Sequence, residues 1–401
     1  MIALSATSVE INAPAAEAPR TTILLSDNAR RPTPLRRREG FIVHDEDIPE
    51  GFGWYLLPSA AARFAERLAN QRTISLPAEL DYLGDGDVIR INPERRAIRV
   101  LFRKSSPHNS FLLTERCNNY CLMCSQPPRN VDDGWIVDEV IDALPLIDRG
   151  TAEIGITGGE PTLLASRFFD LVRAAKSYLP DTALHVLSNG RLFRDLEQAQ
   201  RLREIDHPDL MLGIPVYSDL AHVHDYVVQA DGAYDETIRG ILNLKRARQK
   251  VEVRVVLHKQ TYERLPQLAT FIARNLLFVD HVALMGLEMM GFARANIEDL
   301  WIDPLDYREQ LTEAVGILDR ARMNVSIYNL QHCLIDRSIW PFARRSISDW
   351  KQGYMPECDG CDLMSSCAGF FASAKYRYSD RVRPIQLSGR EAIRTALEQR
   401  P

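Results

Sequence analysis

The sequence predicts an α/β fold in which parallel strands alternate with helices. From about Asn109 onward, short apolar segments of strand length alternate with longer amphipathic segments of helix length. The apolar segments are rich in valine, as in 251–257, which is typical of strands buried on both faces. Strands joined through helices pair in parallel with right-handed crossovers, so these observations together give the fold class.

Six strands and the helices between them are expected in this region, which we assign to residues 108–295. The expected strands are Phe111–Leu113, Glu153–Ile156, Leu184–Leu187, Leu210–Val216, Val251–Leu257 and Val282–Met285. The expected helices are Asp138–Ile147, Arg167–Ser177, Leu192–Arg203, Tyr234–Arg248 and Leu265–Asn275. A further helix at Tyr307–Arg322 and a strand at Val325–Tyr328 belong to a cysteine-bearing C-terminal region, 296–401.

Two segments precede the alternating region. Residues 1–40 are rich in Ala, Pro and Arg with little apolar periodicity, so they are expected to form a disordered arm. Residues 41–107 are expected to form a small α+β module. It would contain a helix near Ala60–Asn70 and two strands, Asp87–Ile91 and Ala97–Phe102.

Composition limits the class of protein. The chain has 401 residues, of which 45% are hydrophobic and 26% charged, which indicates a globular protein of two to three domains. The net charge of −5 argues against nucleic acid as a partner. No run of 18 apolar residues and no secretory signal are visible, so no membrane is expected. Seven clustered cysteines favour a reduced compartment, and the expected location is the cytoplasm.

Three cysteines follow the first strand directly: Cys117, Cys121 and Cys124. Three thiolates on one short loop can converge on one metal centre. A structural zinc site needs a fourth protein ligand, and none is adjacent. A 4Fe–4S cluster held by three cysteines instead leaves one iron open to bind another molecule. Three scattered core cysteines and a partial zinc site are the alternatives.

The spacing of these cysteines after a strand resembles that of the radical S-adenosylmethionine enzymes. In that family the amino and carboxylate groups of S-adenosylmethionine chelate the open iron of a 4Fe–4S cluster. The resemblance implies an incomplete parallel (β/α)6 TIM-like barrel with the cluster at the C-terminal ends of its strands. It also implies that one-electron reduction splits S-adenosylmethionine into methionine and a 5′-deoxyadenosyl radical, which abstracts hydrogen from the substrate.

Residues at later strand ends resemble those with which the family holds S-adenosylmethionine. The Gly-Gly-Glu-Pro segment 158–161 ends the second strand and resembles the segment that contacts the methionine amino group. The residue before the third cysteine, usually an aromatic against the adenine, is here a methionine, whose thioether can pack on a ring face. The candidates for binding S-adenosylmethionine are Met123, Gly158, Gly159, Glu160, Pro161, Ser188, Asn189, Ser218 and Arg254.

The other four cysteines are Cys333, Cys358, Cys361 and Cys367. Four thiolates can close either a zinc site or a fully ligated iron–sulfur cluster, and residue chemistry does not choose between them. The spacing of the last three resembles the SPASM or twitch region of peptide-modifying radical enzymes, which implies a second, auxiliary 4Fe–4S cluster. With four cysteine ligands no iron is open, so this cluster would carry electrons or staple the C-terminal region.

Three strings resemble the His-Xaa-Ser system radical maturases of the HxsC type: Leu113–Pro128, Ala283–Glu288 and Ser346–Trp350. The resemblance implies a small substrate peptide with His-Xaa-Ser repeats and a second radical maturase as partners. Cluster reduction would need an external electron donor such as flavodoxin or ferredoxin. Glu288, at the end of the sixth expected strand, is a candidate substrate contact.

The residues alone leave two other functions open. One is radical chemistry on a small molecule, as in the synthesis of molybdopterin-type cofactors, and the other is a non-enzymatic zinc-binding adaptor. The four thiolates of the second group favour the peptide over the small molecule. His222, His224 and Asp225 could bind a metal or exchange protons, although a loop-to-helix entry explains them more simply.

Overall fold

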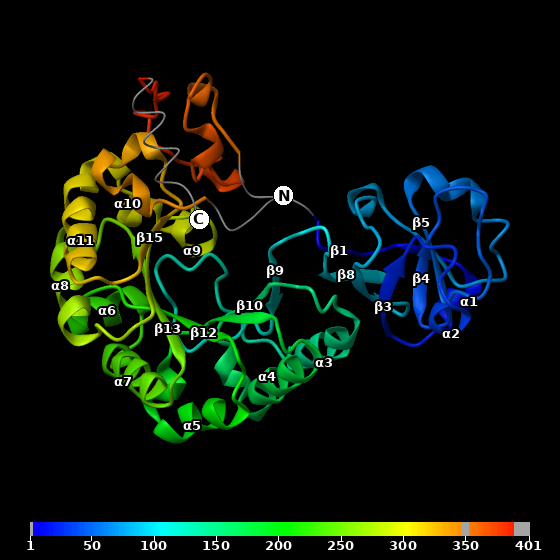
Figure 1. The fold of residues 1–401 in the computed structure, drawn as a ribbon. Helices are drawn as coiled ribbons and strands as arrows, with labels where there is room; N and C mark the ends of the chain where they lie inside the picture. The colour runs from blue at the N-terminus through cyan, green and yellow to red at the C-terminus, as the bar shows by residue number, and fades with distance from the viewer. Residues whose placement is uncertain (1–2, 346–352, 389–401) are drawn as a thin grey trace.

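The structure, a computed structural model, describes residues 3–345 and 353–388, which form two lobes with one sheet each (Figure 1). The smaller lobe contains an eight-stranded sheet built from residues 5–102. The larger lobe contains a seven-stranded sheet that begins at residue 109, and a C-terminal region follows it. All seven cysteines therefore lie in the larger lobe or in the C-terminal region.

The seven-stranded sheet is parallel throughout, as the sequence predicts. Its strands lie side by side in chain order, from β9 at one edge to β15 at the other. Their bounds are β9 Asn109–Leu112, β10 Glu153–Thr157, β11 Ala183–Leu187, β12 Leu210–Pro215, β13 Lys250–Leu257, β14 His281–Gly286 and β15 Val325–Tyr328. The carboxyl ends of all seven strands consequently meet at one end of the sheet.

The sheet has one strand more than the six that we expected. β15 pairs with β14 from Val325 to Tyr328, so the parallel sheet extends beyond residue 295. The helix before it, α11 (Arg308–Arg320), buries Leu311 and Leu318 in the same core. The sequence predicted this helix and strand but not that they belong to the sheet. The stretch between β14 and α11, which is described throughout, contains three short helices and no long crossover helix: α9 (Gly291–Ala295), α10 (Ile297–Leu300) and the 3₁₀ helix Pro304–Tyr307. The sequence therefore shows no clear sign of the connection.

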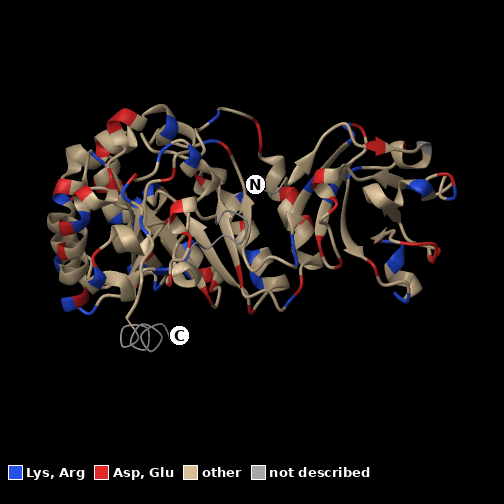
Figure 2. Cartoon of the chain, turned by 90° about the horizontal axis from the view of Figure 1, so that it is seen from above, with Lys and Arg blue, Asp and Glu red and all other residues tan. Residues whose placement is uncertain are grey.

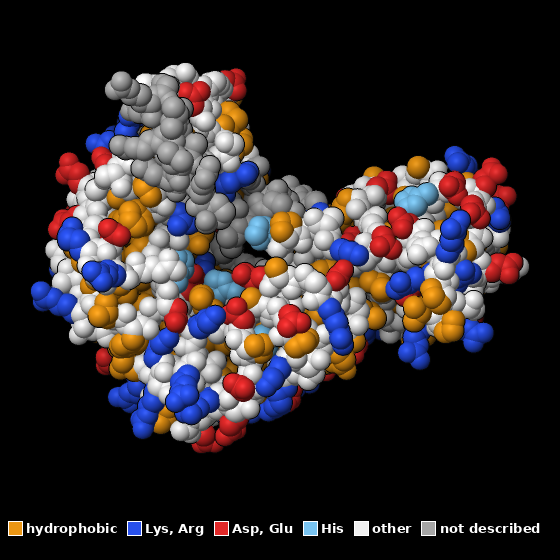
Figure 3. Space-filling model, in the orientation of Figure 1, with side chains coloured by type: hydrophobic (Ala, Val, Ile, Leu, Met, Phe, Trp, Pro, Cys, Tyr) orange, Lys and Arg blue, Asp and Glu red, His pale blue; other side chains and the backbone are white. Residues whose placement is uncertain are grey.

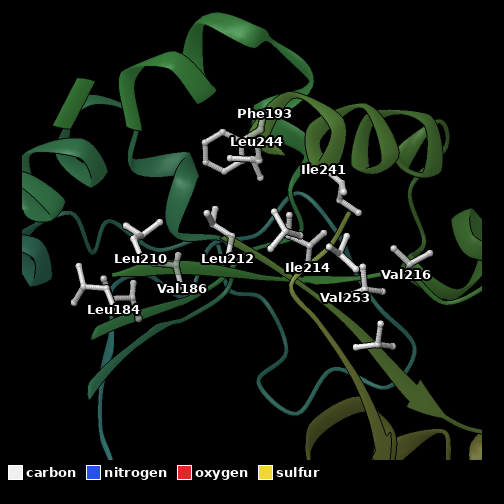
Figure 4. Packing of buried hydrophobic residues seen from close by; sticks show 14 of the residues in the cluster. Leu184, Val186, Phe193, Leu210, Leu212, Ile214, Val216, Ile241, Leu244 and Val253 are labelled. Carbon is white, nitrogen blue, oxygen red and sulfur yellow. The ribbon is translucent and has the colours of Figure 1, made fainter. Parts of the chain in front are cut away.

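Helices cover one face of the curved sheet and leave the other face free for the site (Figure 1). They are α3 Trp135–Ala143, α4 Ser166–Tyr178, α5 Leu196–Ile205, α7 Ala233–Arg246, α8 Leu265–Asn275 and α11, whereas α6 Ala221–Val228 buries Val227 and Val228 in a separate cluster. The core between them and the strands contains Leu184, Val186, Phe193, Leu212, Ile214, Ile241, Leu244 and Val253 (Figure 4). We call the face without these helices the inner face. Alternate strand residues point to it, and several of them are polar.

The expectation of a disordered arm over residues 1–40 is wrong. The described part of this segment contributes four strands to the smaller sheet: β1 Ser5–Ala6, β2 Glu10–Ile11, β3 Thr21–Ser26 and β4 Glu39–Ile42. β3 is central, since it pairs with β4 and β7 and buries Ile23 and Leu25. Two of the arginines in this segment make side-chain contacts within the lobe. Arg31 forms an ion pair with Glu39, and Arg36 donates to three backbone carbonyls.

The rest of the smaller lobe follows the expected outline in part. Its other strands are β5 Trp54–Leu57, β6 Thr73–Ser75, β7 Val88–Asn92 and β8 Ala97–Phe102, and the last two match the expected pair. The helix expected near Ala60–Asn70 is a 3₁₀ helix of six residues, Ser59–Phe64. The lobe joins α3 of the larger one through Glu139, whose buried carboxylate pairs with Arg99 at 2.9 Å and with Arg90 at 3.6 Å.

After β15, the described chain consists mainly of 3₁₀ helices and loops, with isolated bridges between Ile327 and Ala343 and between Gly353 and Phe370. Positive and negative side chains are interspersed over both lobes (Figure 2). The face seen in Figure 3 is hollowed near its centre, beside the inner face of the sheet. Among the described helices, none has the length and apolarity needed to cross a bilayer.

Candidate active site

The three-cysteine loop lies at the carboxyl end of the sheet, between β9 and α3. Its backbone is held on two sides. The N–H groups of Tyr120 and Leu122 each donate at 2.9 Å to carbonyls of the last two residues of α6. On the other side, the N–H of Phe292 in α9 donates to the carbonyl of Cys124 at 2.8 Å. Elements that follow β12 and β14 therefore fix a loop that follows β9.

The three thiols of this loop are partly buried and lie within electrostatic reach of one another. Burial raises the pKa of Cys117 to about 11 and that of Cys121 to about 12, and neighbouring thiolates raise both further. Burial also raises the pKa of Cys124. The raised pKa values favour the protonated thiols. A bound metal favours the thiolates instead, because it coordinates the deprotonated form.

The donor set fits a 4Fe–4S cluster. In the described part of the chain, no three His, Cys, Asp or Glu side chains are close enough to share a single ion. A cluster does not require such convergence, because each cysteine binds a different iron. Cys117, Cys121 and Cys124 would hold three irons of such a cluster.

The Gly-Gly-Glu-Pro segment is bonded directly to the chain that leads into the cysteine loop. The Gly159 N–H donates to the Thr114 carbonyl at 2.7 Å, and the Glu160 N–H donates to the Arg116 carbonyl at 2.8 Å. Gly158 has a φ of +144°, and a Cβ at Gly158 or Gly159 would clash with the backbone of that chain. The glycines thus allow two backbone segments to approach closely beside the first cysteine.

Glu160 itself is fully enclosed. Its carboxylate accepts hydrogen bonds from the N–H and hydroxyl of Thr162 at 3.0 and 2.6 Å. It also accepts from the Ser188 hydroxyl at 2.9 Å and the Asn189 N–H at 2.6 Å. Burial raises the pKa of this carboxyl, and the four hydrogen bonds oppose the rise. Its contacts tie the end of β10 to the end of β11, and Pro161 begins the 3₁₀ helix that follows it.

Asn189 extends this connection to the cysteine loop. Its side-chain amide donates to the Asn118 side chain at 2.6 Å. Arg191, two residues further on, donates to the Asn118 carbonyl and to the Asn119 side chain, each at 2.7 Å. The other side of this guanidinium binds Glu236 in α7 at 2.6 Å. The predicted cysteine, Gly-Gly-Glu-Pro and Ser188–Asn189 segments therefore form one hydrogen-bonded rim.

Sequence reasoning missed two residues of this rim, Arg191 and Asp133. Asp133 is buried and accepts from the Thr114 hydroxyl at 2.9 Å and from the Glu115 N–H at 2.5 Å, which fixes the start of the cysteine loop. The position of Arg191 directly after Ser188-Asn189-Gly190 was an available signal. Asp133 lies in a loop without a recognisable motif, so no local signal pointed to it.

Met123 packs in a small apolar cluster under the loop, with Tyr217 and Val227 among its neighbours. Tyr217 is a further residue that sequence reasoning missed. Burial raises the pKa of its hydroxyl well above the usual value, the three thiols raise it further, and Arg254 lowers it. Tyr217 follows Val216, whose N–H donates to the Arg254 carbonyl at 3.0 Å, so Tyr217 lies next to both the cysteine loop and β13.

The candidate residues that follow β12 form hydrogen bonds to nearby backbone groups or are exposed to solvent. The Ser218 hydroxyl is buried and accepts from the Leu220 N–H at 3.2 Å. His224 accepts from the Tyr217 N–H through Nδ1 at 3.2 Å, and burial lowers its pKa to about 4, so the ring is neutral. Asp225 accepts from two N–H groups at the start of α7, while His222 is exposed. These side chains do not converge on one point.

The other four cysteines surround one small cavity of about 20 Å³. Cys333, Cys358, Cys361 and Cys367 all line it, together with residues that include His332 and Arg383. Burial raises the pKa of Cys333 to about 11, with the neighbouring thiols adding to the rise. Four thiols around one cavity fit a bound metal centre.

Both groups of cysteines lie toward the carboxyl end of the sheet, since Gln331 lines the four-cysteine cavity and also a second cavity that is lined by the last residues of β13 and β14. α9 contacts the cysteine loop on one side and the C-terminal region on the other. Phe292 bonds to Cys124, and two residues on, Arg294 donates to the Tyr376 hydroxyl of the C-terminal region at 3.0 Å. The second cavity has a volume of about 80 Å³ and lies beside this contact. Glu288, after β14, lines it together with Gln331, which also lines the four-cysteine cavity.

Comparison with known proteins finds one family model that matches part of the chain. Residues 111–272 match the family model of the radical SAM superfamily, and this segment contains the cysteine loop and the rim. A curated relative, Fe-coproporphyrin III synthase of Methanosarcina barkeri (strain Fusaro / DSM 804), is 27% identical over 161 residues. This stretch covers 39% of the chain and 38% of the relative, so the chain spans about two fifths of the length of the curated relative it matches.

The solved structures that match the chain have low sequence identity to it. Streptococcus suis SuiB bound to S-adenosylmethionine is 16% identical with a TM-score of 0.46, over 58% of this chain and 52% of that one. Native anSMEcpe with bound AdoMet is 13% identical with a TM-score of 0.49, over 72% and 94%. Coproporphyrinogen III oxidase (HemN) from Escherichia coli is 17% identical with a TM-score of 0.42, over 54% and 53%.

The family match supports the radical SAM superfamily and agrees with the geometry of the loop. Enzymes of that superfamily use a 4Fe–4S cluster and S-adenosylmethionine, and the residues of the cysteine loop fit such a cluster.

Proposed function

We propose that this enzyme modifies a small ribosomally made peptide with His-Xaa-Ser repeats. The observation that carries the proposal is the four-cysteine cavity at the same end of the sheet as the three-cysteine loop. A second metal centre beside the first suits the oxidation of a peptide. Hydrogen abstraction leaves a substrate radical, and its further oxidation releases one electron that needs an acceptor.

The chain's residues bind and shield the cofactors. Cys117, Cys121 and Cys124 would hold the first cluster. With S-adenosylmethionine and one electron, such a cluster would supply radical chemistry that removes a hydrogen atom from a bound substrate. The apolar cluster around Met123 and Tyr217 excludes water from this space, which protects a reactive radical.

The candidates for binding S-adenosylmethionine divide into two groups. Glu160, Ser188 and Asn189 are bonded to one another and to the loop, so they hold the rim in shape and leave the cofactor to backbone groups and remaining donors. Arg254 lies on the inner face and offers a fixed positive charge to the cofactor carboxylate. Met123 lies in the apolar cluster and is the proposed adenine contact.

The second centre is assigned to Cys333, Cys358, Cys361 and Cys367, as an auxiliary 4Fe–4S cluster that carries electrons. The 80 Å³ cavity beside it is the proposed place for a substrate side chain, with Glu288 as a contact. The proposed partners are the His-Xaa-Ser peptide, a second radical maturase of the same system and a flavodoxin or ferredoxin as electron donor. Such a system would work in the cytoplasm.

A mass measurement tests this function. Anaerobically reconstituted protein is incubated with S-adenosylmethionine, a reductant and a synthetic peptide with His-Xaa-Ser repeats. We expect a mass change in the peptide that requires all three components. A peptide of the same composition without the repeat is the control. Formation of 5′-deoxyadenosine with both peptides unchanged would contradict the peptide assignment.

The second candidate is radical chemistry on a small molecule. The curated relative favours it, since that protein is named for a porphyrin product. The same incubation with Fe-coproporphyrin precursors or a molybdopterin precursor in place of the peptide separates the two candidates. Substrate-dependent formation of 5′-deoxyadenosine should occur with one class of substrate.

A further inference from the structure

A buried polar cluster crosses the inner face of the sheet at Glu252 in β13. One carboxylate oxygen lies 2.6 Å from Nδ1 of His281 in β14. The other lies 2.6 Å from Arg254 and 3.4 Å from Nε2 of His185 in β11. The far nitrogen of His281 lies 3.0 Å from the Ser326 hydroxyl in β15. These five side chains, the inner cluster, connect four of the seven strands.

The carboxylate of Glu252 is ionised although it is only 4% exposed. Burial alone would raise the pKa of this carboxyl. Contacts with His185 and His281 and the charge of Arg254 outweigh burial, so the pKa is held well below its usual range. A buried carboxylate with several polar partners in fixed positions is a rigid anchor for a neighbouring cation.

Arg254 is held by this anchor at a defined place. It stands two residues along β13 from Glu252 toward the carboxyl end, on the same face. One terminal nitrogen binds Glu252 and the other lies 3.1 Å from the Met285 sulfur. Gly213 of β12 leaves the necessary room, because a Cβ there would lie 3.0 Å from both Arg254 Cδ and His185 Nε2.

The position of Arg254 relates the inner cluster to the cysteine loop. The Arg254 carbonyl accepts a hydrogen bond from the Val216 N–H at 3.0 Å, and the next residue, Tyr217, packs with Met123 of the cysteine loop, so Arg254 lies on the loop side of Glu252. A thioether is a weak acceptor, so the nitrogen beside Met285 can change to a stronger partner at little cost. Arg254 therefore retains donors for an anionic group between the inner cluster and the loop.

We propose that Glu252 is a positioning residue that fixes Arg254 to receive the carboxylate of S-adenosylmethionine. The proposal rests on the radical SAM function. The proposal predicts the opposite change in affinity for S-adenosylmethionine from the one that charge alone would give. Removing the negative charge of Glu252 makes the site more positive, so charge alone would tighten the binding of an anionic carboxylate. If Glu252 acts by position, its removal weakens binding.

The test measures the dissociation constant for S-adenosylmethionine by equilibrium dialysis on anaerobic, iron-loaded enzyme. We expect Arg254→Met to weaken binding by about 10- to 100-fold, as for a lost charge-assisted hydrogen bond. Glu252→Gln should weaken it by about 10-fold. Because Glu252 acts through Arg254, the double variant should bind no more weakly than Arg254→Met alone. Iron content should be unchanged in all three variants.

A matched control separates positioning from general stability. Glu139 is also a 4%-exposed glutamate that pairs with arginines, but it lies between the lobes. Glu139→Gln should lower the unfolding temperature and leave the dissociation constant unchanged. If Glu252→Gln is insoluble, Gly213→Ala replaces it. The added methyl group displaces Arg254 without changing a charge and should weaken binding.

Three results would overturn the proposal: unchanged or tighter binding by Glu252→Gln, an additive loss in the double variant, or unchanged binding by Arg254→Met. If Arg254→Met binds S-adenosylmethionine normally but no longer modifies the peptide, Arg254 contacts the substrate and not the cofactor. Absence of binding by the iron-loaded wild-type enzyme would instead refute the radical SAM function, so the two failures are distinguishable.

Discussion

The carboxylate of Glu160 accepts a hydrogen bond from the backbone N–H of Asn189 at 2.6 Å, which joins the ends of β10 and β11. Asn189 in turn bonds to Asn118 in the cysteine loop. Three segments that are far apart in the sequence are thereby held as one rim. The shape of this rim depends on the buried carboxylate of Glu160.

Replacing Glu160 should destabilise the fold strongly. Glu160→Ala leaves four donors without their acceptor in a buried place, which should cost about 3–5 kcal/mol of unfolding free energy. Denaturant unfolding of the purified protein measures this loss. Glu153→Ala on β10, an exposed glutamate, is the control and should change the free energy by less than about 0.5 kcal/mol. Equal losses of unfolding free energy in both variants would show that the hydrogen bonds of Glu160 do not stabilise the fold specifically.

Arg191 should control how well the cysteine loop retains its metal. Arg191→Met removes the donors to Asn118 and Asn119, which should loosen the loop by about 1–3 kcal/mol. The expected result is a lower iron content after gel filtration of reconstituted protein. Arg194 binds the same Glu236 but is more exposed, so Arg194→Met should retain iron like the wild type. Equal iron loss in both variants would contradict this role.

His258 should make the protein sensitive to acid. In the described structure neither ring nitrogen of this buried side chain has a hydrogen-bond partner, and burial lowers its pKa to about 4. The ring is neutral when folded and takes up a proton more readily when unfolded. Its contribution to stability is therefore full above pH 6.5 and is lost as the pH falls from about 6.5 toward 4.

His258→Leu should remove this part of the pH dependence, which amounts to about 3 kcal/mol at most. Thermal unfolding of wild type and variant between pH 7 and pH 4 measures it. The wild type should lose stability over this range more steeply than the variant. Parallel curves would show that His258 does not titrate on unfolding.

Cys361 should distinguish an electron carrier from a structural staple at the second centre. We expect Cys361→Ala to give a folded protein that cleaves S-adenosylmethionine but modifies little peptide, because the released electron has no acceptor. Chromatography of 5′-deoxyadenosine and mass measurement of the peptide check this result. Loss of soluble protein would favour a staple, and retained peptide modification without the second cluster would exclude both roles.

The sequence predicted the parts of the site that depend on local spacing. The cysteine loop after β9 and the Gly-Gly-Glu-Pro turn after β10 lie together at the carboxyl end of the sheet, because parallel strands place their ends side by side. Long-range contacts were not predictable. The inner cluster joins residues of four strands, and its members become neighbours only through the register of the sheet.

The N-terminal segment shows a second reason why part of the fold could not be predicted from the sequence. β3 is six residues long and lies among prolines and arginines, so composition outweighed its short apolar core of Ile23 and Leu25. The stabilising contacts of Arg31 and Arg36 are to a distant carboxylate and to backbone carbonyls. Such contacts leave no periodic signal in the sequence.

The most direct test of the account is the formation of 5′-deoxyadenosine by anaerobically reconstituted protein with S-adenosylmethionine and dithionite. We predict that the wild type forms it, that Cys361→Ala forms it, and that the triple variant Cys117→Ala, Cys121→Ala, Cys124→Ala does not. Formation by the triple variant, or none by an iron-loaded wild type, would contradict the assignment of the three-cysteine loop as the site of radical generation.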